Sequence, residues 1–184
     1  FGQGKTYEFT PVKAGTIKIA QEVDVSKWDN TVAATDFQQL LTKNGGKVDG
    51  VLAANDGNAG AAIGILKSKN LQVPVTGQDA SIQGLQYILS GDQCMTVFKD
   101  VSKEAAAASE LAIDLVNGDT AAANALATGT LHDPTGNRDI PSVLLTPESI
   151  TLKNINDVVT AGAVTAADLC KGYTKQCASA GVTG

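Results

Sequence analysis

The chain has 184 residues, enough for one ordinary hydrophobic core, so one domain is the simplest expectation. Hydrophobic residues make up 43% and charged residues 18% of the sequence, a balance typical of a folded domain. The formal net charge of −5 argues against a nucleic acid or an anionic membrane as partner, and no apolar run approaches the roughly 20 residues that span a bilayer. The sequence begins at Phe1 without Met, as expected of a processed, tagged or truncated product.

In chain order, short apolar runs alternate with helical patterns. A short strand is expected at 16–20, and the polar connection 21–30 contains the only tryptophan, Trp28. A helix is expected at 31–42, with Asn30 as its N-cap and a Gly-Gly stop after it. The elements that follow are strands at 48–54, 73–76 and 94–98 and helices at 58–69, 81–90 and about 102–117. This βαβαβα order predicts an α/β fold in which helices flank a parallel sheet.

The regular alternation ends after the last of these helices. Residues 119–139 are rich in Ala, Thr, Gly and Asn and are expected to form an irregular connection. One more strand is expected at 141–145, followed by short helices at 152–161 and 165–170. The final small residues, 178–184, are expected to be mobile.

The sequence contains three cysteines. Cys170 and Cys177 flank a short polar loop, and this spacing favours a disulfide, which is typical of an exported protein. The alternative is two free thiols on a frayed tail. Cys94 begins a predicted strand and is expected to be a buried, unreactive thiol.

Polar side chains follow three successive strands of the predicted sheet. The apolar run 51–54 breaks off at Asn55 and Asp56, the next strand leads to Gln78 and Asp79, and the third ends at Lys99. In open α/β sheets, ligands bind just beyond the carboxyl ends of the strands. We therefore expect Asn55, Asp79 and Lys99 to present an amide, an acid and a cation to one binding edge, with Asp56 and Gln78 as further candidates.

Each of these residues also has a purely structural interpretation. An Asn-Asp-Gly turn can simply end a strand, Asp79 can cap the helix at 81–90, and Lys99 can be a solvated charge. Trp28 either packs on the core or forms an exposed platform, and its polar neighbours favour exposure. An indole face pairs with the C–H face of a pyranose, while carboxylates and amides hydrogen-bond to its hydroxyls.

Catalytic motifs are scarce. His132, the only histidine, lies in the expected irregular connection, where His132-Asp133 favours a turn over part of a catalytic triad. The sequence has no nucleophile elbow, no Walker loop and no clustered metal ligands. We therefore expect neither an enzyme nor a cofactor or metal site.

Taken together, these segments resemble the xylose-binding branch of the class I periplasmic sugar-binding proteins that feed ABC importers. The likeness runs from about residue 15 to residue 170, in the family's order and at similar spacings. The matching segments are 28–29, 51–57, 73–80, 95–99, the Ala-rich helix that follows, and 141–145. The resemblance implies the periplasmic-binding-protein-like I fold, with Trp28 as the stacking platform and Asn55, Asp79 and Lys99 as hydrogen-bonding groups for the sugar.

Family members have two lobes of similar size that trap the sugar between them, and this chain resembles the second lobe. On that basis, residues 1–15 are a remnant of the N-terminal region, 16–170 form the sugar-binding lobe, and 171–184 form a tail. Elements at about 94–146 are those that cross the hinge towards the first lobe. A fragment, a half-length relative or one of two chains would each fit, and an uncovered crossing segment favours dimerisation, exchange of elements or a changed fold.

The sequence thus predicts a monosaccharide-binding component of an ABC sugar importer, outside the cytoplasm as a periplasmic protein or cell-surface lipoprotein. Its expected partners are a xylose-like sugar, the membrane subunits of the importer, and the missing N-terminal lobe or a second copy. The alternatives are the effector-binding domain of a sugar-responsive transcription regulator or sensor, and an interaction module that has lost sugar binding.

Overall fold

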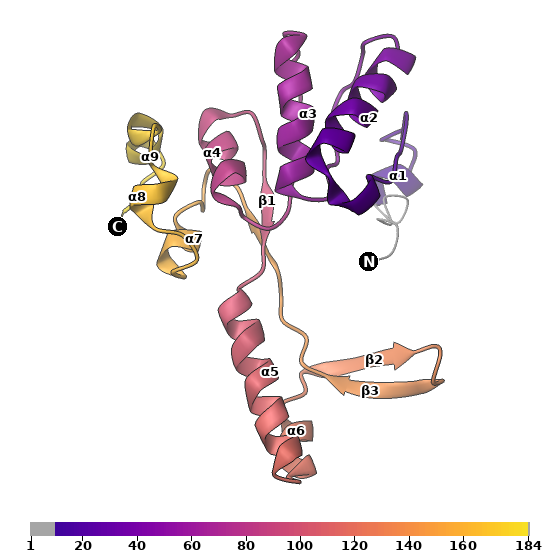
Figure 1. Cartoon of the computed structure of the whole chain (residues 1–184), viewed down its shortest axis with the longest axis vertical. Coiled ribbons are helices and arrows are strands. Elements are labelled where there is room, and N and C mark those ends of the chain that lie inside the picture. The colour runs from indigo at the N-terminus through magenta and orange to yellow at the C-terminus, as the bar shows by residue number, and fades with distance from the viewer. Residues whose placement is uncertain (1–9, 184) are drawn as a thin grey trace. The chain divides into compact units, whose positions relative to one another are not determined.

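The computed structural model describes residues 10–183. The contacts divide the chain into two units (Figure 1). Unit 1 contains the described residues up to Phe98 together with those from Ser149 onward, and unit 2 is Lys99–Glu148. The expected crossing elements, about 94–146, overlap largely with unit 2. Each unit is described by itself.

Unit 1 is built on short extended segments that lie side by side. Parallel bridges join Val51 to Val75 and Thr76 to Met95, and β1 (Thr96–Phe98) pairs with β4 (Glu148–Ile150). The parallel direction of the three predicted strands is therefore confirmed, although the ladders between them are shorter than the sequence predicts. Pro74 helps to keep the ladder short. Its carbonyl accepts from the Val51 N–H, but proline has no N–H with which to extend the ladder.

The prediction of a strand at 16–20 is wrong. These residues have no regular structure and are exposed, with Ile17 and Ile19 exposing 52% and 40% of their surface. Before them lies α1 (Thr10–Lys13), and after them the 3₁₀ turn η2 (Ser26–Trp28). An alternating pattern does not make a strand unless another segment is available to pair with it.

Three of the predicted helices in unit 1 are confirmed within two residues at each end. They are α2 (Asn30–Lys43), α3 (Asp56–Ser68) and α4 (Ile82–Ser90). The prediction of Asn30 as the N-cap of α2 is wrong by one position. The N-cap is Asp29, whose carboxylate accepts from the backbone N–H groups of the first turn. Ser81 caps α4 by accepting from the Gly84 N–H.

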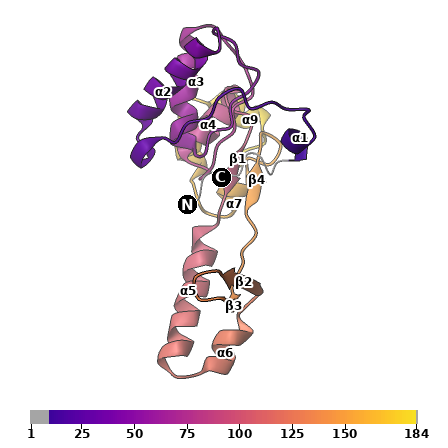
Figure 2. The ribbon, with the colours of Figure 1, turned by 90° about the vertical axis from the view of Figure 1, so that its right-hand side faces the viewer.

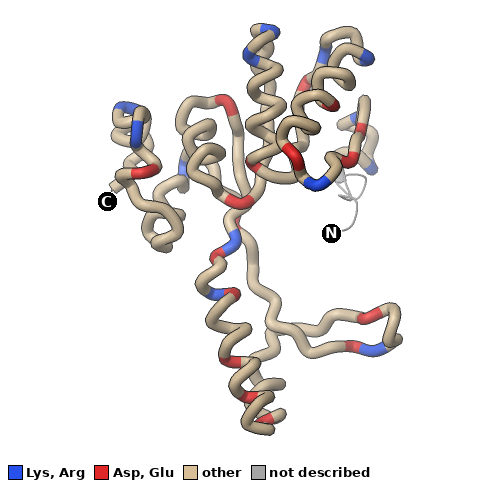
Figure 3. Tube along the Cα trace, viewed as in Figure 1, with Lys and Arg blue, Asp and Glu red and all other residues tan. Residues whose placement is uncertain are grey.

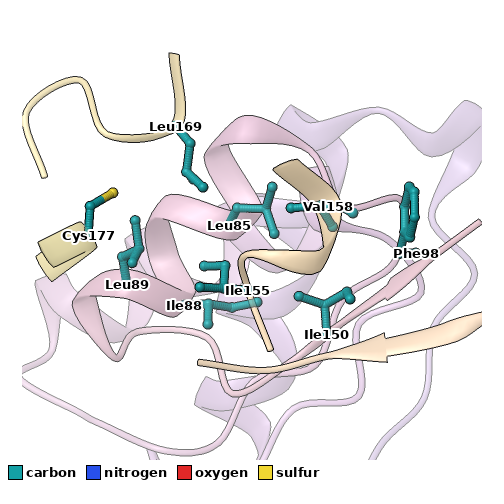
Figure 4. Packing of buried hydrophobic residues seen from close by; sticks show 10 residues of the cluster. Leu85, Ile88, Leu89, Phe98, Ile150, Ile155, Val158, Leu169 and Cys177 are labelled. Carbon is teal, nitrogen blue, oxygen red and sulfur yellow. The ribbon is translucent and has the colours of Figure 1, made fainter. Parts of the chain in front are cut away.

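The hydrophobic core of unit 1 has two clusters, one centred on α3 and one on α4. In the first, Ile63 and Leu66 of α3 pack with Val75. In the second, Leu85 and Ile88 of α4 face the strand pair (Figure 4). The buried partners in the second cluster include Leu89, Phe98, Ile150, Ile155, Val158, Leu169 and Cys177. The helices therefore fix the extended segments between them, as expected for a sheet flanked by helices.

The C-terminal part of unit 1 contains three short helices, α7 (Asp157–Thr160), α8 (Ala166–Leu169) and α9 (Thr174–Ser179). The helix expected at 152–161 is thus much shorter, because hydrogen bonds from Thr151 to the Asn154 side chain form a turn before it. Residues 171–184, expected as a tail, contain α9.

The predicted disulfide between Cys170 and Cys177 is present, and it attaches α9 to the α4 cluster through the buried Cys177. The expectation that Cys94 is buried is wrong, because its thiol is exposed. Successive residues of an extended segment face opposite sides. Here the neighbouring Gln93 takes the inward position, at 2% exposure.

Unit 2 begins with α5 (Val101–Val116), which confirms the Ala-rich helix, and continues with α6 (Thr120–Ala125) beside its end (Figure 2). An antiparallel hairpin follows, made of β2 (Gly129–Asp133) and β3 (Arg138–Ser142). The prediction of an irregular connection at 119–139 is therefore wrong.

Unit 2 buries little apolar surface. Among its described residues, Ala123 is the one buried hydrophobic side chain, and α5 buries none. Large apolar side chains of α5 remain exposed, among them Val101, Ile113, Leu115 and Val116. A segment of this size gains little free energy from burial within itself.

Charged residues of both signs are interspersed along the described chain (Figure 3). Lys43 and Lys67 lie in the last turns of α2 and α3, where a cation is favoured by the helix dipole. None of the helices in the described part of the chain combines the length and apolarity needed to cross a membrane.

Replacing Cys170 and Cys177 together by Ser is expected to lower the free energy of unfolding by about 2 kcal/mol, because the disulfide restricts the unfolded chain. Urea unfolding of oxidised protein measures the change. Cys94→Ser, at an exposed position, is the matched control and should leave the midpoint nearly unchanged. An equal loss in both variants would contradict a structural role for the disulfide.

Candidate functional site

Backbone hydrogen bonds bring successive strand ends of unit 1 to one edge. The Asp56 N–H donates to the Gln78 carbonyl at 2.9 Å, and the Asp79 N–H donates to the Val97 carbonyl at 2.8 Å. We call the edge formed by Asn55, Asp56, Gln78, Asp79 and Val97 the strand-end rim. The rim places the predicted candidates of the first two strands side by side, as parallel strands should.

Asn55 is the N-cap of α3 and is half buried. Its Oδ1 accepts from the Asn58 N–H at 2.8 Å and so caps the helix. The capping role and a binding role are compatible, because the side-chain NH2 group carries donors that the cap does not use.

Asp79 is exposed on the rim and has an unusual backbone. Its φ is +97°, and that of the following Ala80 is +49°, both in the region that side chains with a Cβ seldom adopt. Each such residue costs on the order of 1–3 kcal/mol and persists only where its surroundings hold it. Two side chains hold this turn: Thr96 Oγ1 accepts from the Ala80 N–H at 3.1 Å, and Asp56 Oδ2 accepts from the Ser81 N–H at 2.8 Å.

Trp28 exposes 50% of its surface, as its polar neighbours predict, and has a φ of +59°. The residues after it are fixed at the start of α2, where Asp29 Oδ1 accepts from the Thr31 N–H at 2.7 Å. The Asn30 side chain lies against Gly57, close enough that a Cβ on Gly57 would be 2.6 Å from its Oδ1. The turn that carries Trp28 therefore lies next to the start of α3, at the same end as the rim.

Asp56 differs from the other rim residues because its carboxylate is buried, with 3% exposure. Its Oδ1 accepts from Gln93 Nε2 and Thr96 Oγ1, both at 2.8 Å. Its Oδ2 accepts from the Ser81 N–H at 2.8 Å and the Ser81 Oγ at 3.0 Å. Four donors are enough to stabilise a carboxylate away from water. They also fill the positions that a ligand's hydroxyls would need.

Two glycines make room for this carboxylate. A Cβ on Gly77 would be 2.2 Å from Asp56 Oδ1, and a Cβ on Gly84 would be 2.3 Å from Asp56 Cγ. No real Cβ comes this close, so both positions require glycine while Asp56 stays in place. Ser81, Gln93 and Thr96 were not singled out by sequence reasoning. No local pattern links them to Asp56, since Gln93 and Thr96 follow it by 37 and 40 residues.

Lys99 is the first residue of unit 2 and directly follows Phe98, the last residue of β1. The chain thus connects it to the rim.

His132 lies in β2 of unit 2 and not in a turn. Its Nδ1 is 2.9 Å from Asp139 Oδ1 across the hairpin, and both side chains are exposed. Within the described residues, no group of three or more acidic, His or Cys side chains is arranged to hold a metal ion.

The chain resembles known proteins in sequence and in fold. Residues 5–120 match the profile of a family described as periplasmic binding protein domain. The chain is 38% identical over 150 residues to the D-xylose-binding periplasmic protein of Escherichia coli, covering 80% of this chain and 44% of that one. It is 33% identical over 162 residues to the D-xylose-binding periplasmic protein of Haemophilus influenzae, covering 86% of this chain and 47% of the relative.

Among solved structures, a carbohydrate transporter solute-binding protein from Chloroflexus aurantiacus in complex with D-glucose aligns with a TM-score of 0.66 at 30% identity. The alignment covers 78% of this chain and 42% of that one. The fold is therefore shared with solute-binding proteins, and the chain spans less than half the length of these three proteins.

Gly84→Ala is expected to lower the free energy of unfolding by at least about 2 kcal/mol, because the added methyl displaces the Asp56 carboxylate from its donors. Thermal unfolding measures the loss. Gly64→Ala in α3 is the control, since its Cβ meets no atom within 4 Å, and it should be neutral or raise stability by up to about 1 kcal/mol. Equal effects of the two changes would show that the carboxylate does not occupy this space.

Backbone hydrogen bonds from Val32 and Thr31 hold the pKa of Asp29 below its ordinary value of 3.8. A depressed folded-state pKa stabilises the fold above the unfolded value and loses this effect as pH falls below about 4. Asp29→Asn keeps a capping oxygen but does not titrate. The stability advantage of Asp29 over Asn, measured by urea unfolding, should therefore shrink as pH falls from about 6 to about 3. An advantage independent of pH would contradict this assignment.

Proposed function

Because the chain belongs to the periplasmic binding protein domain family, we propose that its strand-end rim binds a monosaccharide of the xylose or glucose type. The observation that carries the proposal is the pair of backbone bonds that join Asp56 to Gln78 and Asp79 to Val97 at one edge, next to Asn55. The exposed Trp28 lies in the turn that precedes α2. The relatives named for D-xylose and the structure holding D-glucose support a sugar as the ligand.

The chemistry of the rim suits a sugar. The indole of Trp28 offers an apolar face for the ring's C–H groups. The Asp79 carboxylate accepts hydrogen bonds from hydroxyls, and the Asn55 amide donates to them. A donor role for Lys99, which begins unit 2, stays a prediction from the sequence. Recognition of hydroxyls by such groups discriminates strongly, because an analogue that lacks a hydroxyl leaves a partner unsatisfied. Gln78, half buried on the rim, is a further candidate contact.

The chain spans less than half the length of its relatives, so we propose that it supplies one half of a two-sided site within the solute-binding component of an ABC sugar importer. Closure of two lobes around the sugar would present the importer's membrane subunits with a shape that depends on the ligand. By itself the half-site should bind weakly, because each polar partner left unmatched costs about 1–3 kcal/mol.

The other half of the site would come from an N-terminal lobe or from a second copy of the chain. The exposed apolar side chains of α5 in unit 2, which buries almost nothing by itself, support a need for such a partner. We place the protein outside the cytoplasm, in the periplasm or as a lipoprotein on the cell surface. The disulfide favours this location over a cytoplasmic sugar-responsive regulator of the same fold.

Calorimetric titration of D-xylose, D-glucose and L-arabinose into the chain tests the proposal. Trp28→Ala and Asp79→Asn are each expected to weaken binding about tenfold or more, because they remove the stacking face and a charged acceptor. Asp139→Asn, an exposed carboxylate on the hairpin of unit 2, is the control and should bind as the parent does. Absence of binding by the parent chain for every sugar would overturn the proposal for this chain. Undiminished binding by a variant would remove that residue from the site.

A further inference from the structure

We propose that Asp56 and Thr96 are positioning residues that hold Asp79 in its ligand-binding conformation. The inference rests on the proposed sugar-binding function. In this proposal Asp56 does not contact the sugar but holds the turn at Asp79 from inside the protein. Thr96 joins the residues on which binding depends.

The first step is the backbone that follows Asp79. The next two N–H groups along the chain both donate to side chains, Ala80 to Thr96 Oγ1 and Ser81 to Asp56 Oδ2. The Thr96 hydroxyl in turn donates to Asp56 Oδ1 at 2.8 Å. The Asp56 carboxylate therefore holds both amides, one directly and one through the threonine hydroxyl.

The second step is the strain that these bonds offset. The positive φ values of Asp79 and Ala80 set the direction in which the exposed Asp79 side chain leaves the backbone. Without the two acceptors, the chain would relax to a negative φ at these positions, since neither is glycine. Relaxation would turn the carboxylate of Asp79 away from its present position on the rim.

The third step is the rigidity of the acceptor itself. Gln93 Nε2 donates to Asp56 Oδ1 and also to the Met95 carbonyl at 3.1 Å, so the carboxylate is fixed from a second strand. Gly77 and Gly84 bring backbone against it from two further sides. A buried carboxylate with four donors and no room to move is a fixed reference for the turn.

Thr96→Val and Thr96→Ser form a matched pair for the test. Thr96 is fully buried, so valine keeps its shape while removing the hydroxyl, and serine keeps the hydroxyl. Valine should weaken sugar binding by about tenfold, and serine should restore it to within about threefold of the parent. A purely structural residue would change stability without this selective rescue of affinity.

A double-mutant cycle with Asp79→Asn identifies the route of the effect. If Thr96 acts through Asp79, valine should weaken binding by less than about twofold in the Asp79→Asn background. The same tenfold loss in both backgrounds would overturn the proposal.

Amide hydrogen exchange supplies a readout that does not depend on sugar. Valine should increase exchange at Ala80 at least about tenfold relative to the parent and to Thr96→Ser, because that amide loses its acceptor. If the parent binds no sugar, the proposed function fails, while the exchange of Ala80 still decides whether Thr96 holds the turn. Unchanged exchange at Ala80 in Thr96→Val would overturn the positioning role.

Discussion

The structure of unit 1 depends on one buried negative charge. Burial of a carboxylate is costly unless its lone pairs are satisfied, and Asp56 meets this condition with donors from Ser81, Gln93 and Thr96. Ser81 is the N-cap of α4, Gln93 lies just before β1, and Thr96 is the first residue of β1, while Asp56 itself begins α3. Satisfying one side chain therefore fixes the relative positions of three strand ends that the short ladders alone would hold weakly.

This constraint explains how a chain with few strand pairings can present an ordered strand-end rim. The groups proposed to contact sugar are exposed or half buried, and the group that orders them lies underneath. The three consecutive residues Asn55-Asp56-Gly57 thus serve both the surface and the interior of unit 1. Asn55 caps a helix at the surface, Asp56 turns inward, and Gly57 leaves room for the Asn30 side chain that follows the Trp28 turn.

The sequence predicted α2, α3 and α4 closely because their apolar spacing and the glycines that follow α2 and α4 are local signals. The Cys170–Cys177 pairing was also local. The hairpin in unit 2 was missed because most of its residues are exposed, so its strands lack an inward apolar set. The inward role of Asp56 was not predictable, since its partners Gln93 and Thr96 are far along the chain and carry no motif. The positive φ of Asp79 likewise arises from tertiary hydrogen bonds and not from its residue type.

The most direct test of the central claim is an NMR titration of the isotopically labelled chain with D-xylose and D-glucose, read at backbone amides. The account predicts concentration-dependent shifts concentrated at Trp28–Asn30, Asn55–Gly57 and Gln78–Ser81, with small changes in the α9 region. Shifts concentrated in the β2–β3 hairpin or around the disulfide, with the strand-end rim unaffected, would contradict it.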